Sequence, residues 1–439
     1  MSGDTATSRL ERWRAQLRSQ SGRWARPGFM AYLAMLGPGL IAANAGNDAA
    51  GVTTYSVVGA RYGYDLLWVL IPITISMAVI QEMAARMGAV TGKGLSDLIR
   101  EQFGVRWTAF AMLVMLIANA GTVVAEFAGI AAAMELFGVP RWVATPIAAA
   151  LVLFIVVRGS YRRVERIFLA LTTVFLTYVG AAFLARPNWG EVFRATVVPS
   201  WQWDSGYIFV FVALVGTTIA PWMQFLLQSS VVDKGVTVAD YTLQRFDAVL
   251  GALLSNSVTF FIIVATAASL HVAAIQVETA QDAARALEPI AGQYAYLLFA
   301  VGLLGASLMG ACVLPITTAY SITEAFGWEN GLDHGFREAP IFYGLITFLL
   351  MGGALLVLIP NLPLVPLLVL TSAINGVLLP VELFFIMRLI NNHELMGSYV
   401  NNLPVNIIAW ATTIIVSLLS IVLLVVTFIL PLFGIHLTE

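Results

Sequence analysis

One acidic side chain lies in a long apolar stretch near the start of the chain. Residues 31–60 contain a single charged residue, Asp48. A helix crosses the hydrocarbon core of a bilayer in roughly 20 residues, so this stretch is long enough to span a membrane. A carboxylate at that depth is costly and usually has a function. Because Gly46 and Gly51 flank it and are weak helix formers, we expect the helix to break at Asp48 and turn backbone carbonyls towards a bound ion.

A second apolar stretch has the same character. Residues 205–232 carry no charge, and their centre contains Gly216 and Pro221. Proline removes an amide donor and clashes with the preceding helical turn. Two interrupted apolar segments in corresponding places of two halves point to the midplane site of a transporter. The sequence therefore predicts two broken helices that meet at one site.

The composition places the whole chain in a membrane. Of 439 residues, 59% are hydrophobic and 11% are charged, whereas soluble domains have about 25% charged residues. The single cysteine, Cys312, excludes an intramolecular disulfide, and four scattered histidines give no zinc-type cluster. We expect an all-α polytopic protein of the plasma membrane, with the lipid bilayer as its surroundings.

Eleven apolar segments follow a basic tail, residues 1–27. The rest of the chain, residues 28–439, forms one transmembrane domain in this interpretation. Placing the N-terminus in the cytoplasm puts 18 of the 23 Lys and Arg residues inside and 5 outside, as the positive-inside rule requires. The predicted segments are 28–59, 65–85, 107–136, 141–157, 167–185, 205–232, 243–270, 288–325, 340–360, 363–389 and 403–431.

Several function classes lack their signatures in this sequence. It contains no Gly-rich phosphate-binding loop, no spacing typical of a catalytic triad and no basic and aromatic stripe for nucleic acid. We therefore expect a protein that is not an enzyme, has no cofactor and binds no nucleic acid. We also expect a monomer.

Several short motifs lie along the chain after the tail. They are Gly37-Pro38 with the region of Asp48, Gly63-Tyr64-Asp65, Ala125-Glu126-Phe127, Pro366 to Ser372 and Leu395 to Asn401. Through these motifs nearly the whole chain after the tail resembles the NRAMP family of divalent-metal transporters. The similarity implies a LeuT-like fold of two inverted five-helix repeats, about 28–186 and 203–390, with an extra helix near 403–431 and helices one and six unwound at the ion.

The departures from the family pattern are informative. Where the family's first broken helix has Asp-Pro-Gly-Asn, this chain has Asp48-Ala49-Ala50-Gly51. Where its sixth helix has Met-Pro-His-Asn, this chain has Ala220-Pro221-Trp222-Met223. The aspartate remains, while the thioether, the histidine and one amide are lost. These changes resemble the NRAMP-related magnesium transporters.

Ligand chemistry supports that branch. Sulfur favours Mn²⁺ and softer ions over Mg²⁺, so its loss at Ala220 removes that preference. Mg²⁺ usually keeps several waters and is held through one or two carboxylates. The resemblance implies Asp48 as the ligand, with backbone carbonyls from Ala45 and Thr217, and a site widened at Gly51 and Ala220. Gln224 either reaches an ion-bound water or makes an interhelical hydrogen bond.

The side chains at the positions that relay protons in the family cannot take up or release a proton in this chain. These positions are occupied by Trp222, Val123 and Leu116, while the carboxylate of Glu126 remains. We interpret Glu126 as one half of a residual ion pair, with Lys234 or an arginine as its partner. Two further carboxylates, Glu82 and Glu382, are interpreted as contacts at helix ends or between helices.

The preferred hypothesis is uptake of a largely hydrated Mg²⁺, and also Mn²⁺, without protons. One alternative is a proton-coupled Mn²⁺ or Fe²⁺ symporter. Alternatives of other classes are an organic-solute transporter with the same fold and a metal sensor that transports nothing. Transport that survives Asp48→Ala would favour the organic-solute transporter.

Overall fold

The structure is a computed structural model that describes residues 47–157, 173–239, 241–329, 331 and 335–429. In these residues the chain is helical and contains no strand. The predicted tail, the first half of the first apolar segment and part of the fifth lie outside them. The helices are α4 (Ala49–Tyr62), η2 (Leu67–Val69), α5 (Leu70–Thr91), α6 (Leu95–Leu136), α7 (Arg141–Val157), η3 (Thr173–Leu176), α9 (Thr177–Leu184), α10 (Trp189–Val197), α11 (Ser205–Thr218), α12 (Pro221–Asp233), α13 (Tyr241–Thr266), η4 (Ala267–His271), α14 (Ala280–Ala284), η5 (Arg285–Leu287), α15 (Glu288–Ala291), η6 (Gly292–Tyr294), α16 (Ala295–Phe326), α17 (Pro340–Val357), α18 (Leu364–Ile390), α19 (His393–Met396), η7 (Gly397–Tyr399), α20 (Leu403–Leu424) and η8 (Val425–Ile429).

The helices agree with the eleven predicted segments wherever the chain is described. Among the described residues, eight helical stretches are long and apolar enough to cross a membrane, and α7 and the stretch 174–184 are shorter apolar helices. The described half of the first predicted segment is α4. The prediction of an all-α polytopic membrane protein is therefore confirmed.

A kink divides the longest helix. Gly104 inside α6 has φ 74° and ψ 177°, a backbone conformation that is accessible mainly to glycine. The kink separates the turns from Leu95 to Phe103 from the long apolar part that follows. The predicted segment 107–136 corresponds to this second part.

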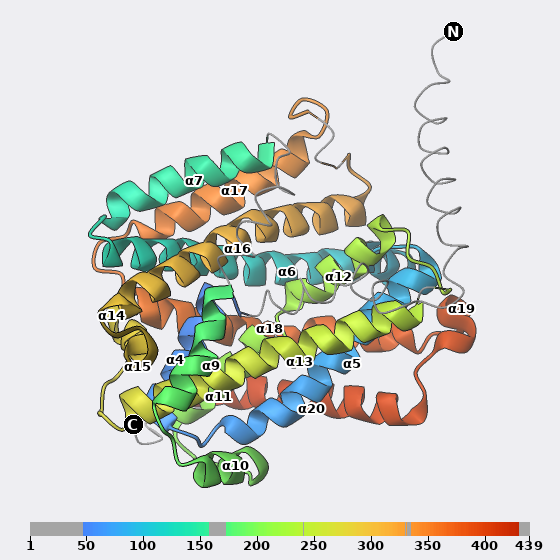
Figure 1. Ribbon diagram of the computed structural model, residues 1–439. Coiled ribbons are helices and arrows are strands. Elements are labelled where there is room, and N and C mark those ends of the chain that lie inside the picture. The colour runs from blue at the N-terminus through green and yellow to red at the C-terminus, as the bar shows by residue number, and fades with distance from the viewer. Residues whose placement is uncertain (1–46, 158–172, 240, 330, 332–334, 430–439) are drawn as a thin grey trace. The chain divides into compact units, whose positions relative to one another are not determined.

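Two long helices form the centre of one half of the molecule. α6 and α16 run side by side (Figure 1) and have the most extensive contact of any helix pair. Glycine permits the close approach, because a Cβ atom built at Gly129 would lie 2.4 Å from Ser307 Oγ. Small residues at such crossings let the backbones of membrane helices come together.

A second close crossing joins α11 to α18. A Cβ atom built at Gly216 would lie 2.2 Å from the backbone nitrogen of Gly376. Four residues after Gly376, Pro380 lies inside α18 and supplies no amide for the Gly376 carbonyl. The hydroxyl of Ser420 on α20 donates a hydrogen bond to that carbonyl at 3.0 Å. A side chain from a neighbouring helix thus satisfies the group that the proline frees, as a membrane interior requires.

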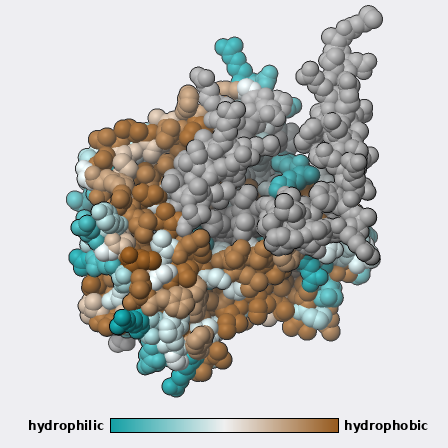
Figure 2. Space-filling model, in the orientation of Figure 1, coloured by the Kyte–Doolittle hydropathy of each residue, from teal (hydrophilic) through white to brown (hydrophobic). Residues whose placement is uncertain are grey.

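The surface has the character expected of a protein in lipid. Figure 2 shows hydrophobic residues over much of the visible face, with hydrophilic residues gathered towards its margins. Exposed large side chains include Ile147 on α7 at 62% and Phe348 on α17 at 64%. Such a broad apolar surface is unusual for a soluble monomer and fits helices that face acyl chains.

One of the two carboxylates predicted to make interhelical contacts does so. Glu82 on α5 lies 3.2 Å from Arg86, and the hydroxyl of Tyr241 on α13 donates to it. Arg86 also donates to the carbonyl of Tyr399 at 3.0 Å. This network joins α5 and α13 to the segment before α20. Glu382, in contrast, has no such contact and is described below.

Candidate cation site

Helix α4 begins directly after Asp48. The Asp48 backbone is extended, with φ −70° and ψ −177°, and Oδ1 accepts a hydrogen bond from the amide of Gly51 at 2.7 Å. This is an N-cap, the role for which aspartate is among the preferred residues. Asp48 is buried, with 5% of its surface exposed, and within the described chain no basic residue forms an ion pair with it. A helix start at Asp48 is compatible with the break predicted here, whose other side lies outside the described residues.

The sixth span is interrupted at its centre. α11 ends at Thr218, Ile219 has φ −118° and ψ 68°, and Ala220 is extended with φ −73° and ψ 140°. α12 then begins at Pro221, whose fixed φ suits the first position of a helix. The break that the sequence predicts around Pro221 is therefore present.

The proline also frees a carbonyl. Pro221 stands four residues after Thr217 and has no amide hydrogen, so the Thr217 carbonyl lacks its helical donor. The carbonyl lies at the C-terminal end of α11, where the helix dipole places partial negative charge. Thr217 is 2% exposed. This is the arrangement in which unwound helices of transporters coordinate a cation.

Polar side chains link the start of α4 to α13 and α4 itself to the end of α11. Asn47 Nδ2 donates to Ser255 Oγ at 3.2 Å, and Thr259 Oγ1 lies 3.5 Å from Asn47 Oδ1. On the other side, the Tyr55 hydroxyl of α4 lies 3.4 Å from Thr218 Oγ1 at the end of α11. The sequence analysis did not select these residues. The signal was available, because Ser255 and Thr259 recur at helical spacing and so lie on one face of the helix.

Glu126 lies on the helix that faces the start of α4. Gly129, one turn further along α6, is so close to α4 that a Cβ atom built there would lie 2.4 Å from the Cβ of Ala49. Glu126 is fully buried against Gly310 on α16. Neither of its carboxylate oxygens has a hydrogen-bond partner among the described residues.

The expected ion pair of Glu126 with Lys234 is wrong. Lys234 follows the last residue of α12, 13 residues beyond Pro221, which corresponds to roughly 20 Å along a helix. Glu126 packs instead near the break itself. The two residues therefore belong to different levels of the membrane.

Among the described residues Gln224 makes no interhelical hydrogen bond, and its contact with an ion-bound water stays a prediction. With its amide oriented so that the nitrogen donates, Nε2 lies 2.8 Å from the carbonyl of Ala220 and 3.0 Å from that of Pro221. The side chain is buried and folds back on the first turn of its own helix. Gln224 thus stabilises the break and keeps its carbonyl oxygen for another partner.

The three side chains that stand where the family pattern has titratable groups are apolar or have no acid–base function. Trp222 is 1% exposed, and its Nε1 has no acceptor among the described residues. Val123 contacts Gly353 on α17, since a Cβ atom built there would lie 2.9 Å from Val123 Cγ1. Leu116 is half-buried and packs against the core. None of these side chains can carry a proton between the site and solvent.

The ligand set is small. In the described part of the chain no three His, Cys, Asp or Glu residues come together to hold a metal. Of the residues assigned from the sequence, Asp48, Gly51, Thr217, Ala220 and Gln224 lie at the two breaks, whereas Ala45 lies outside the described residues. Oxygen ligands of this kind suit hard divalent cations.

Comparisons with known proteins agree with this architecture. The family model described as "Natural resistance-associated macrophage protein-like" (Nramp) matches residues 39–426. The chain is 29% identical over 410 residues to a protein of Ralstonia nicotianae named "Divalent metal cation transporter MntH", covering 89% of this chain and 90% of that one. A Bacillus subtilis protein of the same name is 24% identical over 411 residues, covering 91% and 94%.

Solved structures share the fold. A manganese transporter from Eremococcus coleocola superposes with a TM-score of 0.77 at 21% identity, covering 93% of this chain and 90% of that one. MhsT, solved in complex with L-phenylalanine, gives a TM-score of 0.57 at 13% identity, covering 88% and 97%. The fold is therefore that of a LeuT-like membrane protein, whose sixth span is interrupted in the described residues. The chain belongs to the Nramp family.

Proposed function

We propose that this protein carries divalent cations across the plasma membrane, with Mg²⁺ as its preferred substrate and Mn²⁺ as a second one. The relatives named above as divalent metal cation and manganese transporters support the general function. In this proposal the N-terminus is cytoplasmic, the protein works as a monomer and the ion moves inward. The repeats are 28–186 and 203–390, with the last helix outside them.

The observation that carries the preference for Mg²⁺ is the pair of residues at the breaks. Asp48 contributes a carboxylate, and the buried, extended Ala220 contributes no sulfur. A site with one carboxylate, free carbonyls and water suits an ion that keeps much of its hydration shell. A site with a thioether would favour softer ions. The ion therefore binds largely hydrated.

The side chains at three other positions argue against proton coupling. Trp222, Val123 and Leu116 offer no titratable group along the inner path. The specific observation that favours the alternative, a proton-coupled Mn²⁺ or Fe²⁺ symporter, is Glu126, whose buried carboxylate has no partner among the described residues. Glu126 is the one titratable group left among these four family positions, so we favour transport without protons.

Uptake into proteoliposomes tests the proposal. The purified protein is reconstituted, and uptake of Mg²⁺ is measured alone and in competition with Mn²⁺, Cd²⁺, Ca²⁺ and Fe²⁺. We expect saturable Mg²⁺ uptake that Mn²⁺ inhibits. No Mg²⁺ uptake beside clear Mn²⁺ uptake would support the symporter, and no uptake of any cation would support a sensor or a transporter of organic solutes.

A further inference from the structure

A second buried carboxylate lies beyond the break, on α18. Glu382 is 6% exposed, and neither of its oxygens has a hydrogen-bond partner among the described residues. The interpretation of Glu382 as a helix-end or interhelical contact is therefore wrong. It stands eight residues before Ile390, the end of α18.

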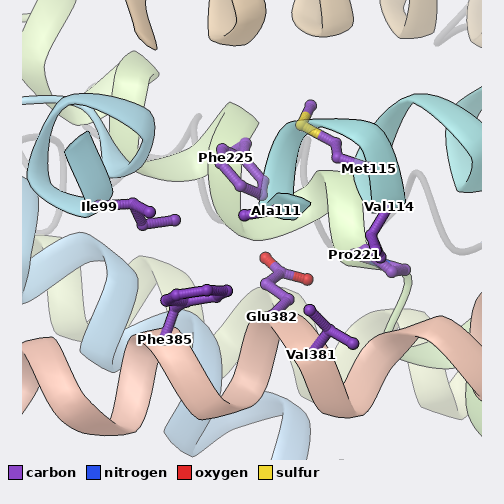
Figure 3. A pocket seen from close by; sticks show the side chains of 9 residues that line it. All are labelled: Ile99, Ala111, Val114, Met115, Pro221, Phe225, Val381, Glu382 and Phe385. Carbon is purple, nitrogen blue, oxygen red and sulfur yellow. The ribbon is translucent and has the colours of Figure 1, made fainter. Parts of the chain in front are cut away.

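The carboxylate points into a cavity between three helices. The cavity has a volume of about 10 Å³, and Figure 3 shows the Glu382 oxygens directed into it. The other lining side chains are apolar. They are Ile99, Ala111, Val114 and Met115 from α6, Pro221 and Phe225 from α12, and Val381 and Phe385 from α18.

The cavity adjoins the break in the sixth span. Pro221, in its wall, is the first residue of α12 and follows Ala220 of the break directly. Phe225 lies one turn further along α12. Since α12 runs from the break to Lys234, which the predicted orientation places at the cytoplasmic surface, Glu382 lies on the cytoplasmic side of the site.

An unpaired carboxylate in such surroundings is costly. A polar group that is buried without a partner lowers stability, and a charged one lowers it more. Ionisable groups at membrane depth that face the interior of the protein mark ion pathways as a rule. The cavity holds about one water molecule, so a hydrated ion enters only when the apolar side chains around Glu382 move apart.

We propose that Glu382 is a second, transient station for the divalent cation, reached from the Asp48 site when α6, α12 and α18 separate on the cytoplasmic side. The ion then meets the carboxylate through its water shell. Two stations in series can each bind the ion weakly, so the ion can leave the first site. Conduction requires sites that an ion can both enter and leave. The inference rests on the proposed transport function and adds to it an exit step.

The test measures Mg²⁺ uptake by full-length protein in proteoliposomes, at varied external and internal Mg²⁺. Glu382→Gln keeps the shape and removes the charge. We expect the maximal rate to fall and the internal Mg²⁺ concentration that half-inhibits uptake to rise, each about tenfold, since a screened charge contact is worth about one factor of ten. The external KM stays unchanged because Asp48 is intact.

Glu382→Asp is the matched control, since it keeps a carboxylate in the same wall. It retains internal inhibition, whereas a role in packing alone would make the shorter side chain at least as harmful as the glutamine. Size-exclusion profiles and melting temperatures are recorded for both variants. Wild-type rate and wild-type internal inhibition in Glu382→Gln would overturn the station. Absence of Mg²⁺ uptake by the wild-type protein would instead overturn the proposed function.

Discussion

The carboxylate of Asp48 accepts a hydrogen bond from the amide of Gly51 at 2.7 Å. One side chain therefore does two things at the centre of the membrane: it starts α4 and it places a negative charge beside the break. The positive end of the α4 dipole stabilises that charge. A cation that binds there offsets the remaining cost of burying it.

The two roles of Asp48 are separable. Asp48→Asn keeps an N-cap, since asparagine caps helices as well as aspartate, while Asp48→Ala removes the cap at a cost of about 1 kcal/mol. We expect both variants to lose Mg²⁺ uptake, and only the alanine variant to melt at a lower temperature. Uptake in liposomes and unfolding in detergent measure the two effects. Near wild-type uptake by Asp48→Asn would show that the carboxylate is not the ligand.

Selectivity should follow the missing sulfur at residue 220. Ala220→Met places a thioether at the break, and we expect Mn²⁺ and Cd²⁺ to compete better against Mg²⁺, because soft ligands favour softer ions. Ala220→Leu is the control, with similar bulk and no sulfur. If both variants change the order of the metals equally, volume and not ligand softness sets the preference. Adding Gly51→Asn should strengthen the effect by narrowing the site.

Mg²⁺ entry should carry charge and move no protons. Each ion brings two positive charges, worth roughly 2 × 2.3 kcal/mol at 100 mV, inside negative. We expect uptake to rise with a potassium-diffusion potential and to ignore an imposed pH gradient. An internal pH dye reports the result, with protein-free vesicles as the baseline. Acidification in step with Mg²⁺ entry would mean that Glu126 or another group carries protons.

The crossing of α11 and α18 depends on the absence of a side chain. In Gly216→Ala the new Cβ would meet backbone atoms of Gly376, and overpacking of this kind costs about 1–3 kcal/mol. We therefore expect a lower melting temperature in detergent. Gly344→Ala in α17 is the control, because a Cβ there meets no atom within 4 Å. Equal stability of the two variants would show that the helices separate at little cost.

The sequence by itself determined the membrane class, most of the spans and the interruption of the sixth span, and it predicts another interruption at Asp48. A proline or a buried aspartate changes the local hydrogen bonding of the chain wherever the helix lies, so Pro221 and Asp48 reveal the breaks without tertiary information. The loss of the methionine sulfur and of the histidine can likewise be read from the amino-acid sequence. The assignment of these residues to an ion remains a proposal.

Only the tertiary structure decided which helices supply hydrogen-bond partners to the buried polar groups. It connected Asn47 to α13, gave the Gly376 carbonyl to Ser420, and left Glu126 and Glu382 without partners among the described residues. The sequence assigned both glutamates to contacts because a buried carboxylate normally has one. Whether it does depends on residues far away in the chain, which come together only when the helices pack.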